Sequence, residues 1–149
     1  MSKRRKAREL ALRASYALEM SGNPVDKIIE EMLLFRPEEE KVKQFAIELL
    51  KKSVEHKRYF DDIISDKAFN WEFERIAILD KLIMRIAICE FLYFEDIPPK
   101  VSIDEAIEIA KKYSTENSGK FINGILDGIL MDLKTKGLLN KSGRGLDEG

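Results

Sequence analysis

The residues best suited to chemistry are six cations within the first thirteen positions of the chain. They are Lys3, Arg4, Arg5, Lys6, Arg8 and Arg13. Glu9 is the one acid among them, so this segment carries a net charge of +5, whereas all 149 residues together have a formal net charge of −1. A charge this concentrated attracts a polyanion or an acidic protein surface. Because the arginine guanidinium grips phosphates and stacks on nucleobases, the segment predicts nucleic-acid binding.

The apolar residues around these cations predict a helix over residues 3–20. They form one stripe along it: Ala7, Leu10, Ala11, Ala14, Ala17 and Leu18. The cations lie outside the stripe and near the helix N-terminus, where they repel one another and oppose the helix dipole, so stability alone does not account for them. RNA is favoured over duplex DNA because no second recognition helix with groove-reading polar residues accompanies this one. An acidic protein partner and a merely solvated face are the alternatives.

A second row of apolar side chains runs along the same predicted helix, almost opposite the alanine-rich stripe. Leu12, Tyr16 and Met20 are spaced at i, i+4 and i+8 and therefore share one face. One interpretation buries this row by wedging the helix between two helical bundles. The other leaves it exposed as a patch for a protein partner. The spacing is compatible with both.

The polar segment 113–120 is a second candidate binding site. It joins two predicted helices and opens the last one, whose free backbone N–H groups suit phosphate or base contacts. Helix capping by Ser114 or Thr115 accounts for about half of its polar residues. Those that capping does not require are Asn117, Lys120 and, just beyond the segment, Asn123.

Glu90 is the titratable group that invites a catalytic interpretation. It falls in a helix predicted over residues 78–95, which is apolar nearly all round and therefore central. An unpaired buried carboxylate would cost roughly several kcal/mol, so we expect a partner from the backbone, Arg75 or Arg85. Neither a nucleophile nor a second catalytic carboxylate accompanies Glu90, which favours a structural ion pair over a general acid. We therefore expect that the protein is not an enzyme.

One cysteine and one histidine limit the chemistry further. Cys89 lies mid-helix in an apolar run, which indicates a core thiol, and His56 and Cys89 cannot supply the ligands of a standard zinc site. We expect no metal and no cofactor. No run approaches the roughly 20 apolar residues of a membrane span, and no apolar signal segment follows the basic start. These features predict a cytoplasmic protein without a membrane partner.

The hydrophobic periodicity predicts an all-α fold with seven or so helices in two packed helical bundles. We expect a single domain over residues 1–136, with subdomains of about 1–67 and 68–136 that share a tight interface. Residues 137–149 are polar and glycine-rich and predict a flexible tail.

Local signals predict where several helices begin. Asn23 should cap a helix with Pro24 at its first position, and Pro37 should begin another. Ser102 and Glu105 have the spacing of a capping box. A last helix is expected from about Thr115 to Lys134, in which Gly124 and Gly128 have the spacing of close helix packing. Phe69, Trp71 and Phe73 predict a short aromatic-rich turn.

Three segments together resemble the NusB family of bacterial transcription antitermination factors. The segment at 98–127, PPKVSIDEAIEIAKKYSTENSGKFINGILD, resembles the C-terminal signature of that family and is specific. The arginine-rich start at 4–16 is similar to the family's first helix, and RIAICE at 85–90 matches its central helix. The resemblance covers about residues 3–134.

This resemblance implies two perpendicular three-helix bundles and a role without catalysis. Family members pair with NusE, which is also a small-subunit ribosomal protein. The pair binds the single-stranded boxA element of ribosomal RNA leaders within the antitermination complex on RNA polymerase, and so supports rRNA transcription. Some relatives form homodimers, and the sequence leaves a monomer or a homodimer open. A pure protein–protein adaptor, whose basic arm meets an acidic partner, is the runner-up function.

The resemblance also implies site residues. By position, those that would contact RNA are Arg4, Arg5, Lys6, Arg8, Asn117, Lys120 and Phe121. Those on the side that meets NusE are Tyr16, Asp80 and Met84, and Met20 shares the helix row of Tyr16. Part of the family has an acid at the position of Asn117. Because an amide there removes a charge that repels RNA, we expect this chain to bind boxA at least as well.

Overall fold

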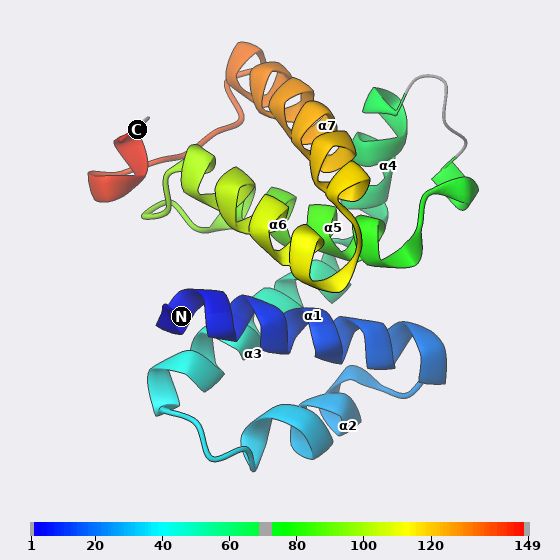
Figure 1. The fold of residues 1–149 in the computed structure, drawn as a ribbon. Coiled ribbons are helices and arrows are strands. Elements are labelled where there is room, and N and C mark those ends of the chain that lie inside the picture. The colour runs from blue at the N-terminus through cyan, green and yellow to red at the C-terminus, as the bar shows by residue number, and fades with distance from the viewer. Residues whose placement is uncertain (1, 69–72, 148–149) are drawn as a thin grey trace. The chain divides into compact units, whose positions relative to one another are not determined.

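The computed structural model describes residues 2–68 and 73–147 and divides into two compact units, Met1–His56 and Lys57–Gly149 (Figure 1). The described residues hold seven α-helices and no strand, which confirms the all-α prediction. The division falls after His56 rather than near residue 67, because α4 (Lys57–Lys67) packs against α5 (Ile78–Tyr93) and α7 (Glu116–Thr135). Phe69 and Trp71 of the predicted aromatic turn lie outside the described residues.

The first unit is built on α1 (Lys3–Ser21), which packs against α3 (Glu40–Glu55). Ser2 caps α1, because its Oγ accepts a hydrogen bond from the Arg5 N–H at 3.1 Å. Gly22 ends the helix in the left-handed region with φ 68°, where a side chain would be strained. The buried alanines of α1 allow a close approach to α3. The core of this pair is Ala7, Leu10, Ala11, Ala14, Val42, Phe45, Ala46, Leu49 and Leu50.

The connection from α1 to α3 contains the short helix α2 (Val25–Ile29) and the π-helical turn η1 (Glu30–Leu34). Its helix starts differ from the prediction. Pro24 occupies the N-cap position of α2 rather than its first turn, and α3 begins at Glu40 rather than Pro37. Glu38 and Glu39 precede α3 and form ion pairs with lysines of α1.

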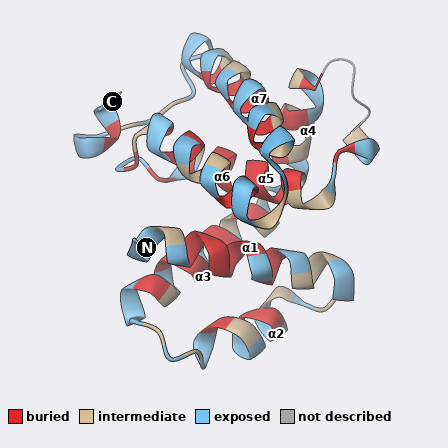
Figure 2. Cartoon of the chain, in the orientation of Figure 1, coloured by how far each residue is buried: buried red, intermediate tan, exposed pale blue. Residues whose placement is uncertain are grey.

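The second unit is organised around α5, which contacts α4, α6 (Pro99–Tyr113) and α7. Every residue from Leu82 to Phe91 is buried, as the all-round apolar pattern predicts, whereas α6 and α7 each keep an exposed face (Figure 2). Helix α6 has proline at its first position, where the fixed φ suits a helix start. Ser102 therefore lies inside α6, and the predicted capping box is wrong.

The two glycines with close-packing spacing on α7 differ in their surroundings. A Cβ at Gly128 would meet the Lys67 side chain of α4 at 3.4 Å, so this position does pack closely. A Cβ at Gly124 would meet no described atom within 4 Å, so the packing prediction is wrong there. Beside Gly128, the Lys67 Nζ pairs with Asp132 Oδ2 of α7 at 2.9 Å.

The segment after α7 returns to the C-terminal end of α5. The Lys141 Nζ donates hydrogen bonds of 2.9 Å to the carbonyl oxygens of Glu90 and Phe94, which are acceptors at a helix end. The Ser142 N–H donates to the Glu95 carbonyl at 3.0 Å, and Gly145 packs so closely on that carbonyl that a side chain would collide with it. The part of the predicted flexible tail around these residues is thus docked on α5, through contacts that local sequence does not signal.

Candidate nucleic-acid interface

The first two turns of α1 present the cations that the sequence singled out. Lys3, Arg4 and Lys6 are exposed and Arg5 is half-buried. The Lys3 Nζ pairs with Glu39 Oε2 at 2.8 Å, and the Lys6 Nζ pairs with Glu38 Oε2 at 2.9 Å. The pair between Lys3 and Glu39 is exposed on both sides, so it contributes little stability, is screened by salt, and allows an anionic ligand to replace the carboxylate. The Glu38 side chain is only 13% exposed.

The Glu39 carboxyl group responds to this arrangement. Its hydrogen bond and charge interaction with Lys3 hold the pKa of Glu39 below its usual range. Glu38 and Glu39, just before α3, thus partly neutralise the basic helix. The sequence does not indicate this, because these acids are more than 30 residues away from the lysines they pair with.

The arginines of α1 are placed by an aromatic ring of α3. The Arg4 guanidinium lies 4.5 Å from the centroid of the Phe45 ring, and the Arg8 guanidinium lies 5.6 Å from it, both within cation–π range. Arg4 remains exposed, but Arg8 is only 3% exposed. Arg8 is buried because its side of the helix adjoins the α3-facing stripe. Its role in RNA binding stays a prediction.

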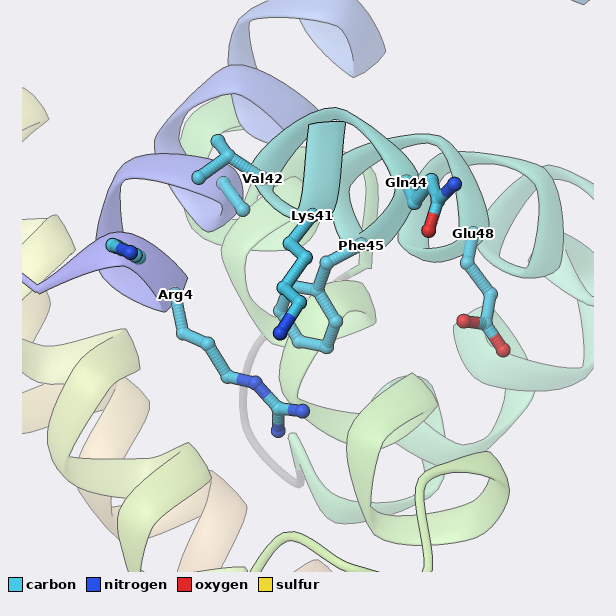
Figure 3. Close-up of a pocket in the computed structure, with 8 residues that line it drawn as sticks. Arg4, Lys41, Val42, Gln44, Phe45 and Glu48 are labelled. Atoms are coloured by element: carbon cyan, nitrogen blue, oxygen red, sulfur yellow. The ribbon is translucent and has the colours of Figure 1, made fainter. Parts of the chain in front are cut away.

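A groove of about 380 Å³ opens between α1 and α3 beside these cations (Figure 3). Lys3 and Arg4 line it from α1, and Lys41, Gln44 and Phe45 line it from α3. These α3 residues carry no signal in the sequence that predicts them as part of the site. Their spacing at i, i+3 and i+4 places them on one helix face, but only the packing of α1 on α3 brings that face to the cations.

The start of α7 carries the second group of candidate residues. Thr115 caps the helix, because its Oγ1 accepts a hydrogen bond from the Ser118 N–H at 3.0 Å, as one of the two capping predictions has it. Asn117 and Lys120 are exposed one turn apart, and Phe121 is half-buried beside them. An amide, an amine and an aromatic edge are therefore presented together at a helix N-terminus.

Asp80 in the first turn of α5 lies beneath this helix start. The Ser114 and Ser118 hydroxyls interact with its carboxyl group and share a hydrogen bond of 2.8 Å, so only one of them is left with a proton to donate to Asp80. Burial raises the pKa of Asp80 above its usual value of 3.8, although hydrogen bonding to these serines opposes this shift. Asp80 thus holds the connection between α6 and α7 and thereby positions Asn117.

The residues assigned to the partner side fall into two groups. Tyr16 is 41% exposed and Met20 is 58% exposed, whereas Leu12 of the same row is buried. Asp80 and Met84 are also buried, because helices pack around α5. Their contact with NusE stays a prediction.

Glu90 is held in the core of the second unit. The Ser102 hydroxyl of α6 donates a hydrogen bond of 2.8 Å to Glu90 Oε1. Arg85, one of the expected partners, reaches Asp61 of α4 at 2.6 Å. Residues 2–68 and 73–147 contain no group of three His, Cys, Asp or Glu side chains that could hold a metal ion. No helix in the same two ranges is long and apolar enough to cross a membrane.

Comparison with known proteins adds independent information. The sequence model of the NusB family matches residues 5–131. The chain is 48% identical over 147 residues to transcription antitermination protein NusB of Chloroherpeton thalassium, covering 96% of this chain and 68% of that relative. Among solved structures, T. maritima NusB is similar with a TM-score of 0.81 and 38% identity, over 89% of this chain and 93% of that one.

A further similar fold comes from a crystal structure of antitermination factors NusB and NusE in complex with dsRNA. The TM-score is 0.79 at 22% identity, over 89% of this chain and 98% of that one. At this identity the likeness bears on the fold alone. The family match extends over most of the chain, including α1 from Arg5 onward, the central helix and most of α7. The chain therefore belongs to the NusB family.

Proposed function

We propose that this chain is a transcription antitermination factor that binds boxA-type RNA of ribosomal RNA leaders together with NusE. Its place of action is then the transcribing RNA polymerase in the bacterial cytoplasm. Family membership supports this proposal, because a relative 48% identical bears the name transcription antitermination protein NusB. A chain of similar fold has been crystallised with NusE and dsRNA, which supports the choice of partners.

The observation that carries the proposal is the cluster of exposed cations on the first turns of α1. Lys3, Arg4 and Lys6 are exposed on a short stretch of one helix, and the phosphates of RNA are the ligand that such spacing suits. The carboxylate paired with Lys3 is exposed, so an RNA phosphate can displace it.

The start of α7 supplies the second part of the proposed RNA site. Lys120 contributes a charge, Asn117 an amide that can donate to and accept from a base, and Phe121 an aromatic ring. The hydrogen bond between the Ser114 and Ser118 hydroxyls and the cap from Thr115 hold this helix start without RNA. Less conformational entropy is then lost on binding.

Tyr16 and Met20 are the proposed contacts with NusE. An exposed aromatic residue and an exposed methionine one turn apart are typical of a protein-binding face. The proposal assigns binding rather than catalysis to the whole chain, and in line with it Glu90 is held by Ser102 inside the helical core.

RNA binding is tested by titrating fluorescent single-stranded boxA RNA, and a duplex of the same length, with and without NusE. Replacing Arg4 and Arg5 together by Ala should weaken binding about tenfold and reduce the salt slope by about 1.4, since each phosphate contact on a single strand contributes about 0.7. The matched control replaces the exposed Lys51 and Arg58 by Ala, which removes the same charge and should leave affinity within about twofold.

The outcomes separate the proposal from its alternative. If the wild-type chain binds neither RNA, even with NusE, the proposal is refuted and the adaptor function gains support. The NusE face has its own variant: replacing Tyr16 and Met20 by Ala should weaken NusE binding but not binding of RNA alone. Met131→Ala, an exposed methionine on α7, is the control.

A further inference from the structure

We infer that the groove between α1 and α3 is a nucleotide-binding subsite, which extends the RNA interface from the basic helix onto α3. In this subsite a nucleobase stacks on the exposed face of the Arg4 guanidinium, and Lys41 contacts the adjoining phosphate. The inference rests on the proposed RNA-binding function and adds residues that neither the family match nor the sequence pattern assigned.

The shape of the groove follows from the residues that form it. Ala7 of α1 and Val42 of α3 are buried at its floor, and the small alanine leaves room above them. The space of about 380 Å³ is bordered on one side by the stems of Lys3 and Arg4 and on the other by α3. Its volume lies within the range of small-ligand pockets, roughly 300–1,000 Å³, and so is ample for one base.

Arg4 is oriented in this groove before any ligand binds. Its guanidinium lies 4.5 Å from the Phe45 ring centroid, and Phe45 is itself held in the core by its place between α1 and α3. The guanidinium lies within cation–π range of the ring, while the residue as a whole remains exposed. A planar cation held in this way offers a flat face for stacking on a base, with less entropy lost on binding.

The charges along the groove favour a phosphate at one end. Lys41 is exposed one helical turn before Phe45, and Figure 3 shows its side chain beside the Phe45 ring while the Arg4 side chain reaches into the same groove from α1. Two cations on one groove repel each other, and the Glu39 carboxylate that interacts with Lys41 offsets this only in part, so a ligand phosphate is favoured there. Gln44 adds a neutral donor and acceptor on α3, whereas Glu48 places a repelling carboxylate one turn further on.

This asymmetry gives the subsite a direction. The phosphate lies at the Lys41 end, the base lies over Arg4, and the strand leaves the groove before Glu48. An acidic peptide would satisfy the cations equally well but would not use the flat guanidinium and the ring beneath it. The aromatic element therefore favours RNA as the occupant.

The test compares matched single variants of α3 by titration with single-stranded boxA RNA at several salt concentrations. Lys41→Ala should weaken binding about five- to tenfold and reduce the salt slope by about 0.7. Lys51→Ala removes an exposed cation from the same helix outside the groove, and should change affinity less than about twofold. Phe45→Leu keeps an apolar side chain in the core but removes the ring under Arg4, and should weaken binding about three- to tenfold.

A second measurement keeps the inference testable if Phe45→Leu does not fold. Wild-type protein is photo-crosslinked to 4-thiouridine-substituted boxA RNA, and the tryptic peptide 44–51 is expected among the crosslinked products. The subsite is overturned if Lys41→Ala and Lys51→Ala have the same RNA affinity, or if no crosslink is found in peptide 44–51. In either case the proposed function still stands, provided that the variant of Arg4 and Arg5 loses RNA affinity. Loss of NusE affinity alone in Lys41→Ala also overturns the subsite. A wild-type chain that binds no RNA refutes the proposed function itself.

Discussion

The ion pair between Asp61 of α4 and Arg85 of α5 allows a quantitative test of what holds the second unit together. The Arg85 Nε and Nη2 atoms donate to the two carboxylate oxygens at 2.6 and 2.9 Å, so the contact is bidentate. The Asp61 side chain is only 19% exposed and the Arg85 side chain only 7%. Asp61→Asn keeps the shape but removes the charge that compensates a nearly buried guanidinium.

The expected cost follows from this burial. Removing one partner of a buried pair costs about 3–5 kcal/mol, and the partial exposure of Asp61 places the expected loss near the lower end, about 3 kcal/mol. For a chain of this size the midpoint temperature should fall by about 6–12 °C. The measurement is urea unfolding followed by circular dichroism, with thermal unfolding as a second probe.

Two further variants sharpen the result. Asp62→Asn makes the same chemical change at the adjacent exposed residue and should alter the free energy of unfolding by less than about 0.5 kcal/mol. Replacing Asp61 by Leu together with Arg85 by Met removes both charges and should recover most of the loss. The reasoning fails if Asp61→Asn is no more destabilising than Asp62→Asn, or if the double variant is less stable than Asp61→Asn.

Three other predictions concern local features of the fold. Ser102→Ala removes the hydroxyl that donates to the buried Glu90 and should cost about 1–3 kcal/mol in urea unfolding, whereas Ser65→Ala, exposed on α4, should cost almost nothing. Because the pKa of Asp80 is raised in the folded protein, the folded state favours the protonated carboxyl group. The stability that this group contributes is therefore fully present below about pH 3.8, and it is lost as the pH rises through the folded-state pKa. Asp80→Asn should therefore gain stability relative to wild type between about pH 3 and pH 7, and a constant difference would contradict this. Gly124→Ala should raise stability by about 0.5–1 kcal/mol because the site is helical and open, while Gly22→Ala should lower it by about 1 kcal/mol because φ there is 68°; thermal unfolding of both variants tests the opposite signs.

The positions of the long helices could be predicted because their signals are local. The apolar stripe of α1, the all-round apolar pattern of α5 and the stripe of α7 all repeat within a few residues. The ends of helices were harder to predict where a distant element contacts the residues at the helix start. Glu38 and Glu39 have the charge expected of a first helical turn, yet they pair with α1 and α3 starts at Glu40.

The sequence predicted which residue types form the candidate site, but not which of those side chains are exposed. The concentration of cations on α1 and the helix start at Thr115 are both present as expected. The burial of Arg8 was not foreseen, because a helical wheel gives the angle of a side chain but not what packs on that side, whereas the burial of Met84 agrees with the all-round apolar pattern of α5. The docking of Lys141 on α5 was missed for the same reason, since its partners lie 51 and 47 residues away.

The sequence by itself determined that the chain is helical, that its positive charge is concentrated in the first helix, and which family it resembles. These properties depend on composition, periodicity and motif spacing, which are complete within short segments. Only the tertiary structure decided which cations remain exposed, that Phe45 orients Arg4, and that Lys41 lies in the same groove. The reason is physical: exposure and preorganisation arise from contacts between elements that are far apart in the chain, and periodicity within one helix carries no information about its neighbour.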